Sequence, residues 1–191
     1  MALQSTPFRW GALARLLHWA MALGLGYAVG LGLWMTDLPV GIQKIKTYAL
    51  HKSVGITLLG IAVIRLLWRL LDDRPLPPPG TPRWQHRAAG LTHVLLYGLM
   101  LLLPLSGWLY NSAAGFPLRW FKLWNLPRLA EPDPALKALA HDLHVYAAWT
   151  LVALVVLHAA AALKHHVVDR DDTLNAMLGR QPPVRRKDPP P

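Results

Sequence analysis

Four long apolar segments alternate with short polar or proline-rich stretches along this chain. They cover roughly residues 10–35, 48–70, 88–110 and 143–163, and each reaches the about 20 residues that an α-helix needs to cross a bilayer. A soluble bundle would carry a polar stripe on each helix, and these segments carry almost none. The pattern predicts an all-α fold, a transmembrane four-helix bundle with up-down-up-down topology.

The same pattern predicts one four-helix membrane domain over residues 1–179. Residues 180–191 are polar and rich in proline, which predicts a disordered cytoplasmic tail. The longest connection, residues 111–140, contains the segment 116–124, in which aromatic residues mix with cations. Such a segment is consistent with a place at the membrane interface and equally with packing on the end of the bundle.

Composition adds two constraints. The 191 residues include 20 Lys and Arg against 10 Asp and Glu, a net charge of +10, and no cysteine. The lack of cysteine excludes disulfides, thiolate-held iron–sulfur clusters and covalent c-type haem. The excess of positive charge is compatible with nucleic acid, anionic lipid or an anionic substrate, and the position of the charges decides between them.

The cations are divided unequally between the two predicted sides of the membrane. Thirteen Lys and Arg fall on the side of the two termini and seven on the other, so the positive-inside rule places both termini in the cytoplasm. Charge spread over two faces is not a nucleic-acid footprint, and membrane lipid accounts for most of it. Arg65 and Arg69, near the end of the second span, are expected to snorkel to the interface.

Ionisable residues inside membrane spans are costly, so each suggests a function. His18 and His158 lie toward the cytoplasmic side of the first and fourth spans, whereas His51 and His144 begin the second and fourth spans on the outer side. The fourteen positions from His144 to His158 make close to four whole helical turns, so the two side chains share a face about 21 Å apart. One metal cannot reach both.

Two stacked sites are possible if each is completed by a histidine from another helix. Depth then pairs His158 with His18 and His144 with His51. Two neutral imidazoles, one on each face of a flat macrocycle, hold a b-type haem without cysteine, and bundle cores are where such sites are built. Zinc or copper is disfavoured because the ligands come in twos and no carboxylate joins them.

Small residues and two further histidines bear on these sites. The first two spans contain glycines at positions 24, 26, 30, 32, 55 and 60, which leave room for a macrocycle or simply allow close helix packing. His93 begins the third span, and His165 lies seven residues beyond His158 on nearly the same face. Either would meet a haem propionate or a bound quinone, or else only a neighbouring helix and the lipid headgroups.

Several short strings of this chain resemble the bacterial cytochrome b-561 family. They are LLHW around His18, LHKSVGI around His51, IRLLWR from Ile64, and LHAAAALKHH from Leu157 followed by DDTL from Asp171. The resemblance covers about residues 8–178 and is greatest to the superoxide-oxidising members. The family comprises small four-helix, di-haem cytochromes of the bacterial inner membrane.

The resemblance implies the same two ligand pairs and two haems b per chain. It also implies that superoxide gives up an electron on the periplasmic side and that ubiquinone is reduced. Cations of the outer side would attract the superoxide anion; the candidates are Lys52, Arg119, Lys122 and Lys137.

Two other functions remain compatible with the residues. The first is an electron-transfer subunit that exchanges electrons between the quinone pool and a partner dehydrogenase or periplasmic protein, with the segment 116–124 as a docking patch. The second is a haem-free channel or transporter that uses its membrane histidines as a proton relay.

Overall fold

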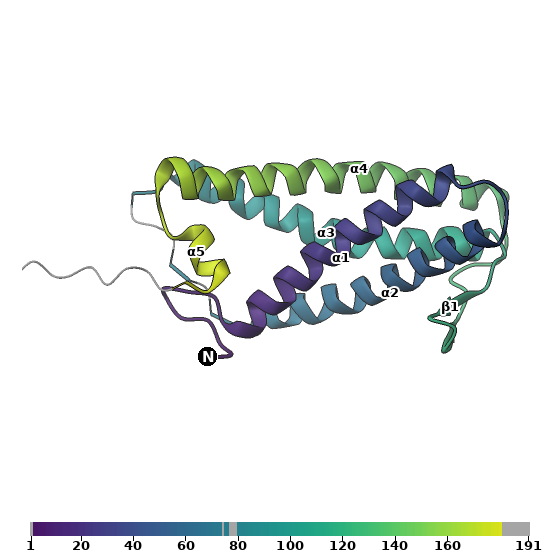
Figure 1. The fold of residues 1–191 in the computed structure, drawn as a ribbon, viewed down its shortest axis with the longest axis horizontal. Helices are drawn as coiled ribbons and strands as arrows, with labels where there is room; N and C mark the ends of the chain where they lie inside the picture. The colour runs from purple at the N-terminus through teal and green to yellow at the C-terminus, as the bar shows by residue number, and fades with distance from the viewer. Residues whose placement is uncertain (1, 74, 77–79, 181–191) are drawn as a thin grey trace, which may run out of the picture.

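The computed structural model describes residues 2–73, 75–76 and 80–180 and confirms the four predicted helices (Figure 1). All four are long and apolar enough to cross a membrane. Helices α2, α3 and α4 extend beyond the predicted apolar segments into the polar flanks, whereas α1 has the predicted length. Their bounds are α1 Ala12–Asp37, α2 Ile42–Leu71, α3 Arg83–Ala113 and α4 Pro134–Lys164.

The start of α4 shows where the hydrophobic pattern misplaces a helix end. The apolar run predicts a start near residue 143, but α4 begins at Pro134. The carboxylate of Asp133 accepts a hydrogen bond from the amide of Leu136 at 2.8 Å, and proline fits the first helical turn because it lacks the amide hydrogen that would be unsatisfied there. The sequence Asp133-Pro134 therefore marks the start of α4, ahead of the apolar run.

The four helices run up-down-up-down, with α1 packed on α2, α2 on α3, and α3 on α4. The start of α1 and the end of α4 consequently lie together, at what we call the terminal end. A π-helical turn, η1 His165–Asp169, and the short helix α5 Thr173–Leu178 fold back over this end. Residues 181–191, most of the predicted tail, lie outside the described residues.

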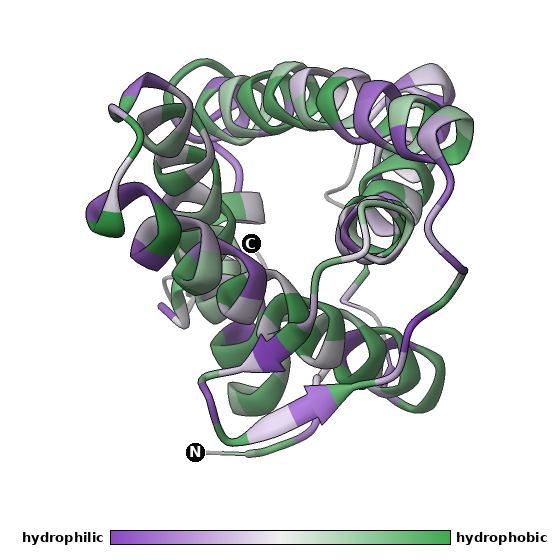
Figure 2. Ribbon diagram, turned by 90° about the vertical axis from the view of Figure 1, so that its right-hand side faces the viewer, coloured by the Kyte–Doolittle hydropathy of each residue, from purple (hydrophilic) through white to green (hydrophobic). Residues whose placement is uncertain are grey.

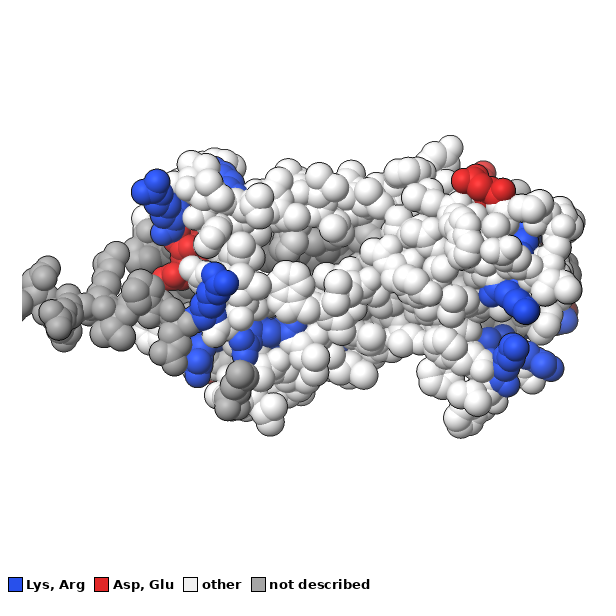
Figure 3. Space-filling model, viewed as in Figure 1, with Lys and Arg blue, Asp and Glu red and all other residues white. Residues whose placement is uncertain are grey.

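Few apolar side chains are buried in the interior of this long bundle. Buried apolar residues form one cluster between α1, α2 and α3 and another between α3 and α4; they are Met21, Leu58, Ala62 and Met100, and Leu103, Ala147 and Leu151. Most other apolar side chains face outward. Figure 3 shows Lys, Arg, Asp and Glu gathered at the two ends, with an uncharged belt between them. This distribution suits helices that are surrounded by lipid.

The connection between α3 and α4 contains a small sheet that the sequence pattern did not predict. Strands β1 Leu118–Trp120 and β2 Trp124–Leu126 pair antiparallel, with Trp120 opposite Trp124. We call this side of the bundle the hairpin end. The hairpin lies at one edge of the bundle instead of covering its whole end (Figure 2).

One edge of the hairpin is docked on α2 and the other is exposed. The amide of Phe121 donates to the hydroxyl of Ser53 at 3.0 Å, and the indole N–H of Trp120 donates to the hydroxyl of Thr57 at 3.0 Å. Leu123 and Trp124, by contrast, are 78% and 73% exposed. Packing on the bundle is therefore confirmed for Trp120 and Phe121 and does not extend to Leu123 and Trp124.

Candidate functional site

The four histidines of the membrane spans meet in two pairs. His18 of α1 and His158 of α4 have ring centroids 6.2 Å apart, and His51 of α2 and His144 of α4 also have centroids 6.2 Å apart. All four rings are half-buried. The pairs are those that depth in the membrane predicts, and we call them the terminal-end pair and the hairpin-end pair.

The separation of the rings suits two imidazoles bound to one metal from opposite sides. With metal–nitrogen bonds of about 2.0–2.1 Å and a ring centroid about 1.2 Å behind the ligating nitrogen, the two centroids would lie about 6.4 Å apart. Both pairs come within a few tenths of an ångström of this value. The four side chains can therefore hold two separate bis-histidine groups.

Two features of the packing near the pairs are compatible with a flat bound group. Helices α1 and α4, which would close the ring of a regular bundle, hardly contact each other, and the terminal-end pair connects them. Gly55 lies one turn from His51 on the same face of α2, and a Cβ atom at this position would meet nothing within 4 Å. These residues fit a bound macrocycle.

The glycines have more than one role. A Cβ atom at Gly32 would lie 3.3 Å from Cε1 of His51, and one at Gly107 would lie 3.1 Å from Cε1 of His144, so both leave room for a histidine ring. Gly24 instead allows α1 to pack against Leu58 of α2. Gly107 was not among the predicted positions, because only the fold brings α3 against His144.

Backbone carbonyls orient the hairpin-end pair. Nδ1 of His51 lies 3.0 Å from the carbonyl oxygen of Ala28, and Nδ1 of His144 lies 2.9 Å from that of Leu103. Since a carbonyl only accepts, both Nδ1 atoms donate, and each Nε2 keeps its lone pair. This arrangement fixes the tautomer that a metal-binding histidine requires.

The terminal-end pair has a charged neighbour instead. Arg65 of α2 donates from Nη2 to Nδ1 of His18 at 2.9 Å and from Nε to the hydroxyl of Tyr97 at 3.1 Å. The prediction that Arg65 snorkels to the interface is therefore wrong: the side chain turns inward because His18 and Tyr97 offer it polar partners. The ring of His93, on α3, lies 5.5 Å from that of His158, so three histidines meet here.

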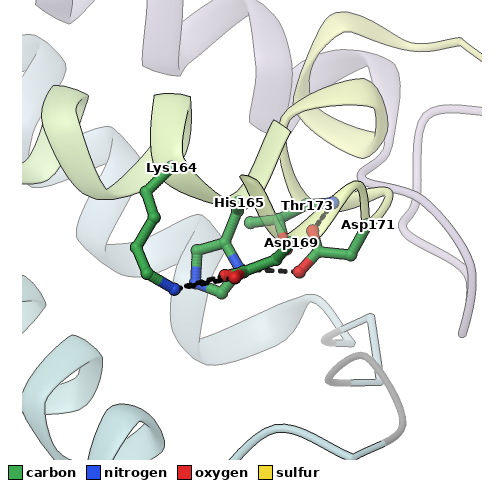
Figure 4. Close-up of polar contacts among 5 residues, drawn as sticks. All are labelled: Lys164, His165, Asp169, Asp171 and Thr173. Atoms are coloured by element: carbon green, nitrogen blue, oxygen red, sulfur yellow. Dashed lines mark hydrogen bonds and ion pairs between the residues drawn. The ribbon is translucent and has the colours of Figure 1, made fainter. Parts of the chain in front are cut away.

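His165 lies in a separate polar cluster at the terminal end (Figure 4). Its Nδ1 is 2.6 Å from Oδ2 of Asp171 and 3.3 Å from Oδ2 of Asp169, and Nζ of Lys164 contacts Asp169 at 2.6 Å. Burial raises the pKa of Asp171, but the hydrogen bonds from Thr173 and His165 outweigh it and hold this pKa below its ordinary 3.8. Carboxylates, and not the paired histidines, thus orient His165.

The predicted steering cations all lie at the hairpin end. Nζ of Lys52 is half-buried and donates to the side-chain oxygen of Asn111 at 2.9 Å, whereas Arg119, Lys122 and Lys137 are exposed. This end carries seven Lys and Arg against four Asp and Glu, a local excess of three positive charges. A cavity of about 200 Å³ lies between the hairpin and the end of α3, with Asn111 and Arg119 in its lining.

Comparison with known proteins places these features in a family. Residues 9–180 match the family model described as prokaryotic cytochrome b561. The chain is 38% identical over 182 residues to "Cytochrome b561 homolog 2" of Escherichia coli (strain K12), covering 94% of this chain and 96% of the relative. It is 35% identical to "Cytochrome b561 homolog 1" of the same strain over 134 residues, and 30% identical to "Probable superoxide oxidase CybB" of Yersinia pestis over 135 residues; each covers 69% of this chain and 74% of the relative.

Proposed function

Because the chain belongs to the prokaryotic cytochrome b561 family of haem b-binding, electron-transferring proteins of the bacterial inner membrane, we propose that it is a di-haem cytochrome. His18 and His158 hold one haem b, and His51 and His144 hold the other. The observation that carries this assignment is the 6.2 Å spacing shared by the two pairs. A haem supplies one-electron transfer, which none of the side chains at these sites can perform alone.

The proposed orientation places the terminal end in the cytoplasm. Its support is the excess of Lys and Arg at that end, in line with the positive-inside rule. The hairpin end then faces the periplasm. Electrons enter at one membrane surface and leave toward the other, because the two histidine pairs lie at different depths.

The proposed reaction is the oxidation of superoxide by ubiquinone. Two superoxide anions each lose one electron and become dioxygen, while one ubiquinone takes up two electrons and two protons and becomes ubiquinol. The cations Lys52, Arg119, Lys122 and Lys137 raise the local concentration of the anion at the hairpin end, and the small cavity beside Arg119 admits it. The relative named as a probable superoxide oxidase supports this substrate.

The terminal end supplies the protons in this proposal. Ubiquinone reduction needs a proton donor at the quinone, and the hydrogen-bonded His165 and Asp171 form such a group close to the cytoplasm. His93, beside His158, is placed to contact either a haem propionate or the quinone. His165 orients the acceptor, His93 contacts either the acceptor or a propionate, and neither ligates iron.

A second candidate function is a plain electron-transfer subunit. Its support is the exposed apolar surface of the hairpin, where Phe116, Leu123 and Trp124 are 61%, 78% and 73% exposed, as on a surface that docks a protein partner. Membership in a haem-binding family leaves the haem-free channel without support.

The test is a reduced-minus-oxidised spectrum of the purified protein, with haem quantified per chain and superoxide supplied as reductant. We expect two haems per chain, reduced rapidly by superoxide and reoxidised by added ubiquinone. Two haems that do not respond to superoxide would favour the electron-transfer subunit. A protein that binds no haem would refute both.

A further inference from the structure

Beside the terminal-end pair lies the positive charge of Arg65, which has no negative partner among the described residues. Arg65 lies six residues before the end of α2, about 9 Å inside the helix at 1.5 Å per residue. Its side chain contacts His18 and Tyr97, and the ring centroid of Tyr97 lies 5.5 Å from the guanidinium carbon. Within the described part of the chain it makes no ion pair with Asp or Glu. Cations inside membrane spans are expected to have an opposite charge nearby.

The hydrogen bond between Arg65 and His18 is incompatible with iron binding by His18. A guanidinium group only donates hydrogen bonds, so Nδ1 of His18 accepts. The proton of the neutral ring is then on Nε2. For Nε2 to bind iron, the proton must move to Nδ1, where it would face a second donor. If Nδ1 itself bound iron, Arg65 would again have to leave. A ligand that occupies this site therefore displaces the guanidinium from His18.

We propose that Arg65 is the counter-cation of the terminal-end haem, pairing with a haem propionate once it has left His18. The proposal rests on the haem ligands given under the proposed function. Arginine suits this task because two of its five N–H groups can donate in parallel to the two oxygens of one carboxylate. Tyr97 retains the guanidinium near the site, since its hydroxyl and its ring both contact Arg65. Arg65 is thus a positioning and tuning residue and not a ligand.

The fixed charge gives electron transfer a direction. A positive charge beside a haem stabilises the reduced form and so raises its reduction potential. The hairpin-end pair has neutral carbonyl partners instead, and the ammonium of Lys52, the cation next to His51 in sequence, is directed to the side chain of Asn111 and not to either ring. The terminal-end haem is therefore the stronger electron acceptor. An electron that enters at the hairpin end is drawn toward the terminal end, where the quinone accepts it.

The experiment uses the full chain with His51→Ala, which leaves only the terminal-end haem to be measured. In this background we compare the parent with Arg65→Met, Arg65→Lys and, as the matched control, Arg69→Met. Arg69 is on the same helix and stacks over Trp10 at 5.2 Å. The readout is the midpoint potential from a spectroscopic redox titration, which does not depend on catalytic activity.

We expect Arg65→Met to lower the midpoint potential, Arg65→Lys to keep it near that of the parent, and Arg69→Met to leave it unchanged. An Arg65→Met protein that binds haem with the parent's midpoint potential would overturn the proposal. If Arg65→Met binds no haem, Arg65→Lys decides: haem bound at the parent's potential supports the role of the charge, and failure to bind haem contradicts it. Retention of both haems in His51→Ala would instead refute the ligand assignment.

Discussion

The two histidine pairs have the same ring separation and different surroundings. At the hairpin end, both Nδ1 atoms face backbone carbonyls, which belong to α1 and α3. At the terminal end, the neighbours of the pair are side chains, namely Arg65, Tyr97 and His93. The hairpin-end pair is therefore oriented mainly by the main chain, with one further contact at 3.2 Å between the Ser106 hydroxyl and Nδ1 of His144, whereas the terminal-end pair is oriented by side chains that a single substitution can remove.

This difference separates two requirements of an electron-transfer chain. Orienting a histidine ligand needs a hydrogen-bond acceptor at Nδ1, and a backbone carbonyl of a neighbouring helix can serve as this acceptor. Setting one potential above the other needs a charge or dipole near only one site, and Arg65 is such a charge. Two identical sites would offer the electron no preferred direction.

The largest expected effect is the loss of one haem at a time. His144→Ala should remove the hairpin-end haem and His158→Ala the terminal-end haem, each lowering the haem content from two per chain to one, because an iron with one imidazole is held much less firmly. Pyridine haemochrome quantification of the purified variants measures this. His141→Ala, on the exposed side of the same helix, is the control and should keep both haems. Variants that each lose both haems would show that the two sites are not independent.

Overpacking should weaken the hairpin-end site alone. Gly107→Val places a side chain where a Cβ atom already lies 3.1 Å from the ring of His144, which costs about 1–3 kcal/mol, or about 5- to 150-fold in haem affinity. Haem titration of the two variants Gly107→Val and Gly98→Val measures the difference. Gly98 is on the same helix and its Cβ would meet nothing within 4 Å, so it should bind as the parent does. Equal haem affinity in the two variants would show that the close packing of Gly107 against the ring of His144 does not affect haem binding.

Reversing exposed charges at the hairpin end should slow the reaction with superoxide. Lys122→Glu combined with Lys137→Glu changes the local net charge by four, and we expect up to about a tenfold lower rate of haem reduction at low salt, with the difference shrinking as salt is added. Stopped-flow spectroscopy at several ionic strengths measures this rate. Arg83→Glu combined with Arg87→Glu, at the terminal end, is the matched control. A rate that is the same in both double variants would refute steering.

The smallest expected effect concerns Asp171 at the terminal end. Its pKa is lowered in the folded protein, so the ionised carboxylate stabilises the fold above the ordinary value of 3.8, and this contribution is lost as the pH falls through the lowered pKa. Asp171→Asn should cost about 1 kcal/mol at neutral pH, or about 2–4 °C in Tm. The difference in Tm between Asp171→Asn and the parent should shrink when the melting curves are repeated at a pH low enough to protonate Asp171. Asp37→Asn, at an exposed residue of the other end, is the matched control.

The apolar runs and the spacing of the histidines were sufficient to predict the helices and the histidine pairs. A run of about 20 apolar residues can satisfy its backbone in lipid only as a helix, and the rise and rotation per residue then place His144 and His158 on one face at two depths. The partners His18 and His51 follow, because they are the histidines of other spans at those depths. The ligand assignment itself still awaits the haem measurements above.

Tertiary structure decided what surrounds those histidines. The direction of Arg65 depends on the distance to Tyr97 and His18, which lie on two other helices, so no period along α2 distinguishes it from an arginine that reaches the membrane surface. The carbonyls of Ala28 and Leu103 likewise reach the histidine rings only because neighbouring helices pack together. Gly107 leaves room for the ring of His144 for the same reason. The hairpin of residues 118–126 forms because its strands pair with each other and dock on Ser53 and Thr57 of α2. Hydrophobic periodicity reports which face of a helix is apolar, but only the packed bundle determines which atoms meet there.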